Sequence, residues 1–282
     1  MRESSGHDPP PYLQRTRLRL AWRMMKTSAH PLEAASRLRA RWRAGESTYG
    51  GWLYLRDSLS AELVARAGFD WVCIDAQHGT ARAGDIVPLL QAIAGAGGTA
   101  VVRVPWNEPG VIMNALDAGA SGVIVPMVNT AAEAEQAVAS CRYPPQGNRS
   151  WGPTRAALGA SNYSAVWANE RVLCIVMVET PAGVDNVDEI LEVPGVDAVF
   201  VGPTDLALSF GVERDEQTNI DRIAAIKRAC DARTVPAGIA AIDVEEAKRS
   251  AGQGFAMVAL PSDAVLLAQS CATLLASVRA DI

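Results

Sequence analysis

The chain has 282 residues, a length that suits one large barrel or two small domains. Hydrophobic residues make up 49% and charged residues 20% of it, an ordinary composition for a globular protein with a sizeable core. The net charge of −5 is unevenly spread, because residues 1–46 carry ten Lys and Arg against four Asp and Glu, and the acidic remainder argues against general nucleic-acid binding.

The sequence gives no sign of membrane insertion or secretion. Gly, Pro or a charged residue interrupts each apolar run before it is long enough to span a bilayer. The first residues lack a compact apolar region followed by a cleavage site. The five cysteines are scattered without CxxC spacing, so we expect them to be reduced. These features predict a cytoplasmic protein.

Residues 1–30 are rich in Arg, Pro and Ser and show no sustained periodicity, so we expect an irregular basic extension. A solvated tail is the favoured interpretation, and an arm for a membrane or a nucleic acid is the alternative. Residues 31–282 are expected to form a single domain. It begins with apolar residues at helical spacing over 32–44, and Gly45 is expected to end this helix.

From residue 48 onward, short apolar segments alternate with helical segments eight times. The expected strands are 48–54, 69–75, 99–104, 122–126, 173–179, 198–201, 235–240 and 255–260. The expected helices are 60–67, 84–96, 109–118, 131–141, 184–191, 219–232, 244–251 and 263–280. Eight such units predict an α/β fold of the (β/α)8 TIM-barrel type, which typically takes about 250 residues. An open doubly wound sheet is the alternative, disfavoured because no GxGxxG follows the first strand and no linker divides the chain.

The connection formed by residues 142–171 is unusually long. Loops beyond about 12–15 residues in a compact domain are usually functional or disordered. Its aromatic, proline and glycine residues indicate packing, and we expect it to form part of an active-site wall. Arg149 and Arg155 in this loop are candidates for contacting an anionic acceptor, with a surface role as the alternative.

The reactive face of a (β/α)8 barrel is built at the carboxyl ends of its strands. The charged residues at those ends are Asp75 and His78 after the second strand, Arg103 after the third, Glu179 after the fifth and Asp205 after the sixth. Each must be solvated or paired at the mouth, which a merely structural barrel does not require. Among the three histidines only His78 stands in a strand-like context, and closing a turn is its alternative role.

Glu179 and Asp205 end consecutive strands and are therefore expected to be neighbours. Two close carboxylates repel each other unless a cation or a shared proton holds them. Neither segment has a Cys or His, so a hard divalent ion, Mg²⁺, Mn²⁺ or Co²⁺, is the favoured partner. Pairing with Arg or helix capping is the alternative. Arg103 suits a carboxylate or an enolate oxygen because its planar fork makes two parallel hydrogen bonds, and a rim salt bridge is its alternative.

Seven segments in order, GGWL, SAELVARAGFDWVCIDAQHG, VVRVPWNEP, ALDAGASGVIVPMV, RYPPQGNRSWGP, VMVET and FVGPTDLALSFG, carry a family resemblance. Over about residues 36–275 the chain resembles the class II, metal-dependent pyruvate aldolases of the HpcH/HpaI family. The resemblance implies a hexamer, a trimer of dimers, whose subunits exchange C-terminal helices. It also implies reversible cleavage of a 4-hydroxy-2-oxo acid into pyruvate or hydroxypyruvate and an aldehyde, through an enolate stabilised by the metal.

The resemblance further assigns roles to individual residues. They are Glu179 and Asp205 as metal ligands, Arg103 as the substrate-orienting arginine, His78 as the catalytic histidine with Asp117 as its partner, Asp75 beside the metal waters, and the backbone of Gly202, Pro203 and Thr204 as the site of the pyruvate carboxylate. Two departures leave donor and acceptor preference open. Gln77, also expected at the substrate, stands where many relatives carry Glu, and Thr204 stands where Ala is usual.

Asp117 is expected at the end of a helix that leads into the fourth strand, and so at the opposite end of its own barrel from His78. We therefore expect Asp117 to serve the site of a neighbouring subunit. Without the resemblance, a helix-end aspartate in an ordinary turn is the alternative.

Three other functions compete with aldol cleavage. A 2-oxo acid decarboxylase would use the same enolate. A CoA-ester lyase of the same superfamily needs a basic groove for the CoA phosphates, for which the acidic body offers no candidate. A non-catalytic binding barrel is the remote alternative. A Schiff-base aldolase is disfavoured because no lysine ends an expected strand.

Overall fold

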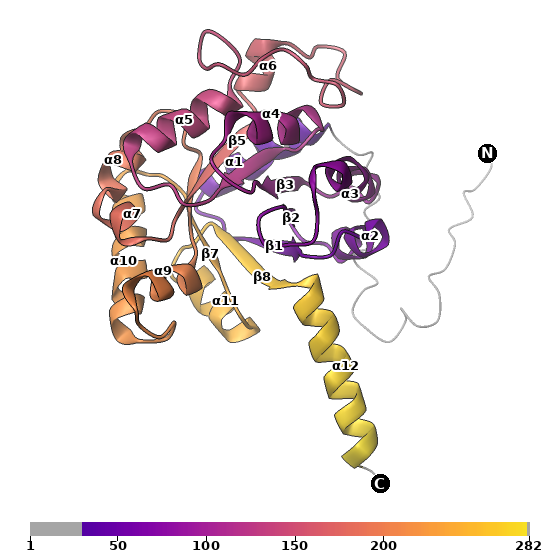
Figure 1. Cartoon of the computed structure of the whole chain (residues 1–282), viewed down its shortest axis with the longest axis vertical. Coiled ribbons are helices and arrows are strands. Elements are labelled where there is room, and N and C mark those ends of the chain that lie inside the picture. The colour runs from indigo at the N-terminus through magenta and orange to yellow at the C-terminus, as the bar shows by residue number, and fades with distance from the viewer. Residues whose placement is uncertain (1–29, 281–282) are drawn as a thin grey trace, which may run out of the picture.

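The structure, a computed structural model, describes residues 30–280 and shows eight parallel strands closed into a barrel (Figure 1). The strands are β1 (Thr48–Leu53), β2 (Trp71–Asp75), β3 (Ala100–Arg103), β4 (Gly122–Val125), β5 (Leu173–Val178), β6 (Ala198–Val201), β7 (Ala237–Ala240) and β8 (Met257–Ser262). Each strand pairs with the next in the chain, and β8 pairs with β1. This topology confirms the predicted (β/α)8 barrel. The basic extension predicted for residues 1–30 lies outside the described residues except for His30.

Helices surround the barrel and cover one of its ends (Figure 1). They are α1 (Pro31–Arg43), α2 (Ser58–Arg66), α3 (Ala83–Gly95), α4 (Pro109–Asp117), α5 (Ala131–Cys141), α6 (Ala165–Asn169), α7 (Pro181–Asp185), α8 (Val187–Glu192), α9 (Pro203–Phe210), α10 (Gln217–Ala232), α11 (Val244–Gly252) and α12 (Asp263–Ala280). In residues 30–280 no helix is both long enough and apolar enough to cross a bilayer.

The strands are continuous apolar runs because both of their faces are buried. In β5, for example, all six residues are buried. The outward-facing side chains pack against the helices, whereas the inward-facing ones fill the barrel with residues such as Trp71 and Phe200. Helix α1 places Trp42 in the same interior cluster, and the Trp42 indole donates to Thr48 Oγ1 at 2.9 Å. Since Thr48 begins β1, α1 closes the amino-terminal end of the barrel and leaves the carboxyl end as its mouth.

The predicted strands and helices agree with the structure to within about two residues at most of their ends. Gly45 follows α1 with a φ of 77°, as expected of a residue that ends a helix. The predicted helix 184–191 is instead two short helices, α7 and α8, which meet at Asn186. Two helices were not predicted: α6, within the long connection, and α9, directly after β6. All five cysteines are unpaired, as predicted.

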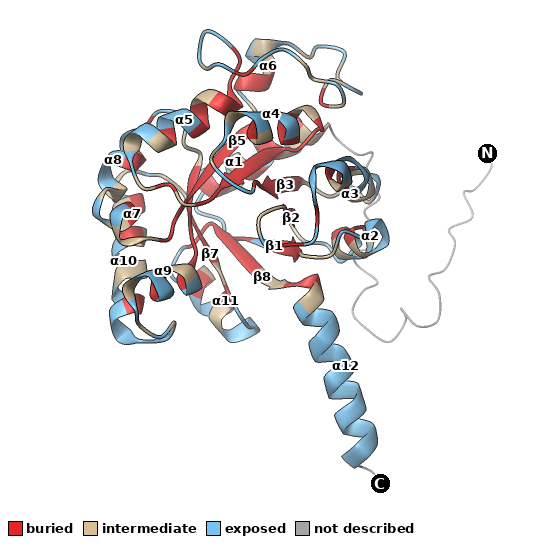
Figure 2. Ribbon diagram, viewed as in Figure 1, coloured by how far each residue is buried: buried red, intermediate tan, exposed pale blue. Residues whose placement is uncertain are grey.

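The C-terminal helix α12 projects from the barrel and has almost no contact with it (Figure 2). Its first residue, Asp263, is buried, but the rest of the helix is largely exposed. The exposed residues include large apolar ones, such as Leu274 at 68% and Val278 at 56% of full exposure. Large exposed apolar surfaces are uncommon on monomeric proteins.

Candidate active site at the carboxyl end of the barrel

Asp75 accepts hydrogen bonds from several residues at the mouth of the barrel. It ends β2, is completely buried and accepts a hydrogen bond from the Trp52 indole at 2.9 Å. Its carboxylate also pairs with Arg103, through Nε at 3.1 Å and through Nη2. Burial by itself opposes ionisation of Asp75, but the hydrogen bonds and charge of Arg103 and the Trp52 bond outweigh it and lower the pKa of the carboxyl group. The buried Asp75 is therefore held as a carboxylate.

Arg103 ends β3 beside Asp75, because the register of the two strands pairs these residues directly. Its guanidinium lies over the Trp52 ring, 5.0 Å from the centroid. The rim salt bridge considered for Arg103 is therefore present in a buried form. Part of its fork is already bound to Asp75, so only its remaining N–H groups are free to meet a substrate.

His78 and Gln77 follow Asp75 in a turn that the same carboxylate fixes. The backbone N–H groups of Gln77 and His78 donate to Asp75 Oδ1 at 3.0 and 3.1 Å. The His78 residue is exposed at the mouth. The Gln77 side chain is partly buried, and its Oε1 has no partner in the described part of the chain. An unpaired buried acceptor of this kind is costly unless a donor reaches it, so Gln77 is a natural contact for a ligand.

Glu179 follows β5 and is buried, with 2% of its surface exposed. Its Oε1 accepts the backbone N–H of Met127 at 2.9 Å. Burial raises the pKa of Glu179, and the nearby charge of Asp205 adds to the rise, while the Met127 N–H and Arg103 oppose it. No Lys, Arg or His among the described residues forms a salt bridge with Glu179 or Asp205. The arginine pairing considered for these acids is thus not found.

Asp205 lies in the first turn of α9, not at a strand end as the sequence suggested. Residues Val178 and Val201 are direct neighbours across β5 and β6, so the chain brings Glu179 and Gly202 together. A Cβ atom built on Gly202 would lie only 2.7 Å from Glu179 Oε2. Glycine at this position therefore leaves that oxygen uncovered. Among residues 30–280 no group of three or more His, Cys, Asp or Glu is placed to hold a metal ion, so these two carboxylates are not joined by a third side chain of these types.

Three residues of the mouth were missed by sequence reasoning. Trp52 and Tyr54 belong to or follow β1, where aromatic residues look like core, and Met127 looks like an apolar strand end. Burial raises the pKa of Tyr54, as do the charges of Asp75 and Asp205, whereas Arg103 lowers it, so the Tyr54 hydroxyl lies among these charges. Met127 has a φ of 58°, rare for a residue with a side chain.

Asp117 lies at the other end of the barrel, as predicted. It ends α4, and its carboxylate pairs with Arg149 Nη2 at 2.6 Å. The backbone of residues 155 and 156 also donates to the Asp117 carbonyl. The connection 142–171, expected to form part of an active-site wall, is therefore at the amino-terminal end of its own barrel. It links a helix to the following strand, and such connections lie opposite the mouth.

Eight parallel strands with a buried ion pair and two unpaired acids at their carboxyl ends define a (β/α)8-barrel enzyme. A family model described as HpcH/HpaI aldolase/citrate lyase matches residues 48–270, and the chain belongs to this family. The resemblance predicted from the seven sequence segments is confirmed.

Curated relatives agree with the family. A hydroxypyruvate/pyruvate aldolase of Rhizorhabdus wittichii is 38% identical over 87% of this chain and 99% of its own length. A 4-hydroxy-2-oxo-heptane-1,7-dioate aldolase of Salmonella arizonae is 39% identical over 85% of this chain and 93% of its own. A crystal structure of an HpcH/HpaI aldolase/citrate lyase family protein from Burkholderia cenocepacia J2315 has 36% identity and a TM-score of 0.82, covering 86% of this chain and 99% of that one. The chain is accordingly a carbon–carbon lyase of the aldolase type.

Proposed function

We propose that this chain reversibly cleaves a 4-hydroxy-2-oxo acid into pyruvate or hydroxypyruvate and an aldehyde, with a divalent cation at Glu179 and Asp205. The observation that carries the proposal is a pair of neighbouring carboxylates without a basic partner, at the mouth of a barrel of this family. The names of two relatives support it: one is a hydroxypyruvate/pyruvate aldolase and the other a 4-hydroxy-2-oxo-heptane-1,7-dioate aldolase.

The carboxylates have the properties expected of a site for a hard cation. Glu179 is buried beside a second negative charge, an arrangement that costs free energy unless a positive charge is added. Oxygen ligands suit Mg²⁺, Mn²⁺ or Co²⁺, and two carboxylates leave further positions for a chelating ligand. A divalent ion bound there supplies a Lewis acid beside the 2-oxo group.

Other residues of the mouth orient the substrate. The free N–H groups of Arg103 give a positive contact to the oxygen that becomes negative as the carbon–carbon bond breaks. The segment of Gly202, Pro203 and Thr204 opens α9 and presents the backbone N–H groups of Gly202 and Thr204, together with the positive end of the helix dipole, to the substrate carboxylate; Pro203 has no N–H group to offer. Gln77 has an unpaired acceptor that can receive a substrate hydroxyl.

His78 is the residue we assign to proton transfer. Its exposed position allows it to meet the 4-hydroxyl of the substrate, and an imidazole nitrogen can accept a proton from a hydroxyl group and return it. Asp117 is proposed to orient a His78 that belongs to a neighbouring subunit, since it lies at the far end of its own barrel. The apolar surface of α12 supports an assembly with exchanged C-terminal helices, which we propose to be a hexamer.

Exchange of the methyl protons of pyruvate with solvent deuterium tests enolate formation directly. Added Mn²⁺ should support exchange, EDTA should abolish it, and Glu179→Gln and Asp205→Asn should each lower it by at least a hundredfold. Glu135→Gln is the matched control, because this glutamate is exposed and forms no salt bridge within residues 30–280. Undiminished exchange after EDTA treatment would reject the metal-dependent scheme.

The shared site is tested by co-expressing two inactive chains. If each site combines His78 of one subunit with Asp117 of another, mixed oligomers of His78→Ala and Asp117→Asn contain some intact sites and regain activity. Oligomers made of either variant alone should stay inactive. Mixed oligomers that remain as inactive as the parents would refute the assignment of Asp117.

A further inference from the structure

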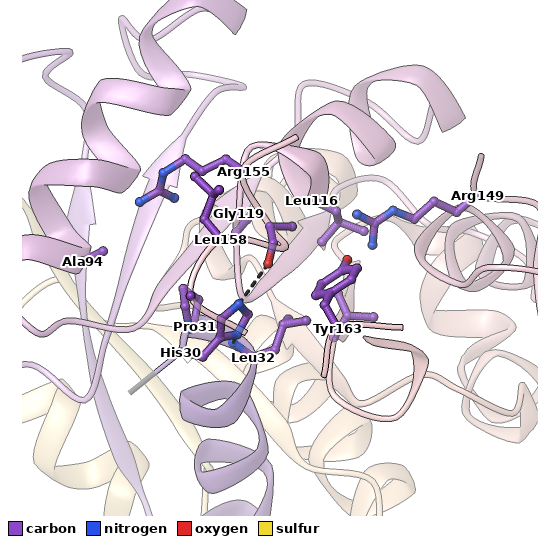
Figure 3. A pocket seen from close by; sticks show the side chains of 14 residues that line it. His30, Pro31, Leu32, Ala94, Leu116, Gly119, Arg149, Arg155, Leu158 and Tyr163 are labelled. Atoms are coloured by element: carbon purple, nitrogen blue, oxygen red, sulfur yellow. Dashed lines mark hydrogen bonds between the residues drawn. The ribbon is translucent and has the colours of Figure 1, made fainter. Parts of the chain in front are cut away.

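A cavity of about 230 Å³ lies at the amino-terminal end of the barrel, where Arg149 both lines it and pairs with Asp117; Figure 3 shows its lining side chains. Residues of α1, α3 and α4 and of the connection 142–171 form its wall. Half of the lining is apolar, with side chains such as Leu32, Leu116 and Leu158. A space of this size holds a ligand of several non-hydrogen atoms, smaller than a typical drug-sized compound.

Arg149 contributes a buried basic group to this cavity, with 2% of its surface exposed. Its guanidinium lies over the Tyr143 ring, 4.5 Å from the centroid, and Nη2 donates to Asp117. Its Nε, however, is buried and has no partner among the described residues. Because this Nε atom is enclosed, a ligand in the cavity meets the positive charge of Arg149 but not this donor.

Arg155 approaches the cavity from the other side, as Figure 3 shows. Its Nη1 donates to the Ala118 carbonyl at 3.0 Å, and no carboxylate of the described residues lies within salt-bridge distance. Burial lowers the pKa of Arg155, which means that the charged form is poorly solvated. A Cβ on Gly119 would lie 2.6 Å from Nη1, so glycine there makes room for the guanidinium.

The charges around the cavity do not cancel. Arg149 and Arg155 line the cavity and no Asp or Glu does, whereas Asp117 is bound to Arg149 outside the lining. His30 also lines the cavity, but burial lowers the pKa of its imidazole, which favours the neutral form. The surplus is one positive charge beside an apolar wall, a combination that matches a small carboxylic acid with a hydrocarbon body.

We propose that this cavity binds a small organic carboxylate, with its charged end at Arg155 and its apolar body against Leu32, Leu116 and Leu158. The carboxylate has two sources of the same chemistry: a free organic acid, or the carboxylate tail of a substrate held by a neighbouring subunit. The binding test below involves no turnover, so its failure is separate from a failure of the aldolase proposal.

Calorimetry with hexanoate tests binding to the full-length chain in the presence of Mn²⁺. Hexanoate should bind, hexanamide should bind at least tenfold more weakly, and Arg155→Gln should weaken hexanoate binding about tenfold. Arg228→Gln, an exposed arginine on α10, is the matched control and should leave the affinity unchanged. Absence of hexanoate binding, equal binding of hexanamide, or an unchanged affinity of Arg155→Gln overturns the proposal.

A second variant keeps the test decisive if Arg155→Gln fails to fold. Leu158 lines the cavity but is 68% exposed, so Leu158→Asp should fold and should weaken hexanoate binding about tenfold by charge repulsion. Equal affinity of this folded variant and the unmodified chain would also overturn the proposal.

Turnover then separates the two sources. With pyruvate as donor, the ratio of kcat/KM for succinic semialdehyde to that for neutral propanal should fall about tenfold in Arg155→Gln if the cavity holds a substrate tail. If hexanoate binding is lost but this ratio is unchanged, the ligand is a free carboxylate. This arm alone rests on the proposed function.

Discussion

Replacement of Gly202 by alanine is the sharpest test of the metal site. The φ of Gly202 is −97°, outside the left-handed region that favours glycine, so the main effect is expected from the added methyl group. That methyl would lie 2.7 Å from Glu179 Oε2 and 3.3 Å from the Met177 methyl carbon. Glu179 cannot keep its position, because nonbonded carbon atoms need roughly 3.5 Å for a favourable contact.

The size of the effect follows from the crowding. Forcing an extra methyl group into a packed site typically costs about 1–3 kcal/mol. Either the native fold bears this cost, or Glu179 rotates away from Asp205 and the cost appears in cation binding. The hydrogen bond from Met127 to Glu179 Oε1 holds one side of the carboxylate, so we expect most of this free-energy cost to weaken cation binding. A cost of about 1–3 kcal/mol corresponds to roughly a 5- to 150-fold loss of cation affinity.

Mn²⁺ titration by calorimetry, with thermal unfolding of the metal-free chain as a second measurement, distinguishes these outcomes. Gly202→Ala should bind Mn²⁺ at least fivefold more weakly while its melting temperature changes by only a few degrees. Gly252→Ala is the control, since a Cβ on this helical glycine meets no atom within 4 Å. An unchanged Mn²⁺ affinity in Gly202→Ala would show that Glu179 Oε2 is not a metal ligand.

Three further predictions concern stability and assembly. Trp52→Phe removes a hydrogen bond to the buried Asp75 carboxylate, so thermal unfolding should show a loss of about 1.5–3 kcal/mol; an unchanged melting temperature would contradict it. Asp75→Asn leaves Arg103 unpaired and should cost about 3–5 kcal/mol at pH 7. Because folding lowers the pKa of Asp75, its stabilisation is complete above the ordinary aspartate pKa and disappears as the pH falls through the lowered value, so urea titrations of wild type and Asp75→Asn should converge only in strong acid. Deletion of residues 265–282, which keeps the buried Asp263, should leave the barrel folded by circular dichroism but reduce the oligomer in light scattering; an oligomer of unchanged mass would refute a role for α12 in assembly.

The barrel could be predicted because its strands are recognisable in the sequence as continuous apolar runs. A parallel strand buried on both faces must be apolar throughout, as in Leu173–Val178, and the intervening helices set the repeat. Helix α9 was missed because Gly202 to Asp205, which open it, were interpreted as the end of the sixth strand. Its signals were present, with Pro203 in the first turn and Gly211 in the left-handed region at its end.

The candidate site was predictable only where charge follows a strand. That rule found Asp75, Arg103 and Glu179, because a charged residue after an apolar run is conspicuous in a sequence. It could not find Met127, since its left-handed backbone and its N–H bond to Glu179 depend on tertiary packing and not on the side chain. Nor could it reveal that Asp75 binds part of the Arg103 guanidinium, because spacing does not give the register between neighbouring strands.

The buried pair of Asp75 and Arg103 explains why the mouth can hold so much charge in a fixed geometry. A buried ion pair contributes little net stability, because desolvation offsets most of its attraction. Here the carboxylate also receives the Trp52 indole and the two N–H groups of the turn that carries His78, so one buried charge positions a guanidinium and a histidine together. The adjacent acids Glu179 and Asp205 form no salt bridge inside the described chain, and the one Met127 N–H that Glu179 accepts does not offset the cost of its burial. This difference supports the proposal that partners within the fold satisfy Asp75, whereas Glu179 and Asp205 are completed by a bound cation.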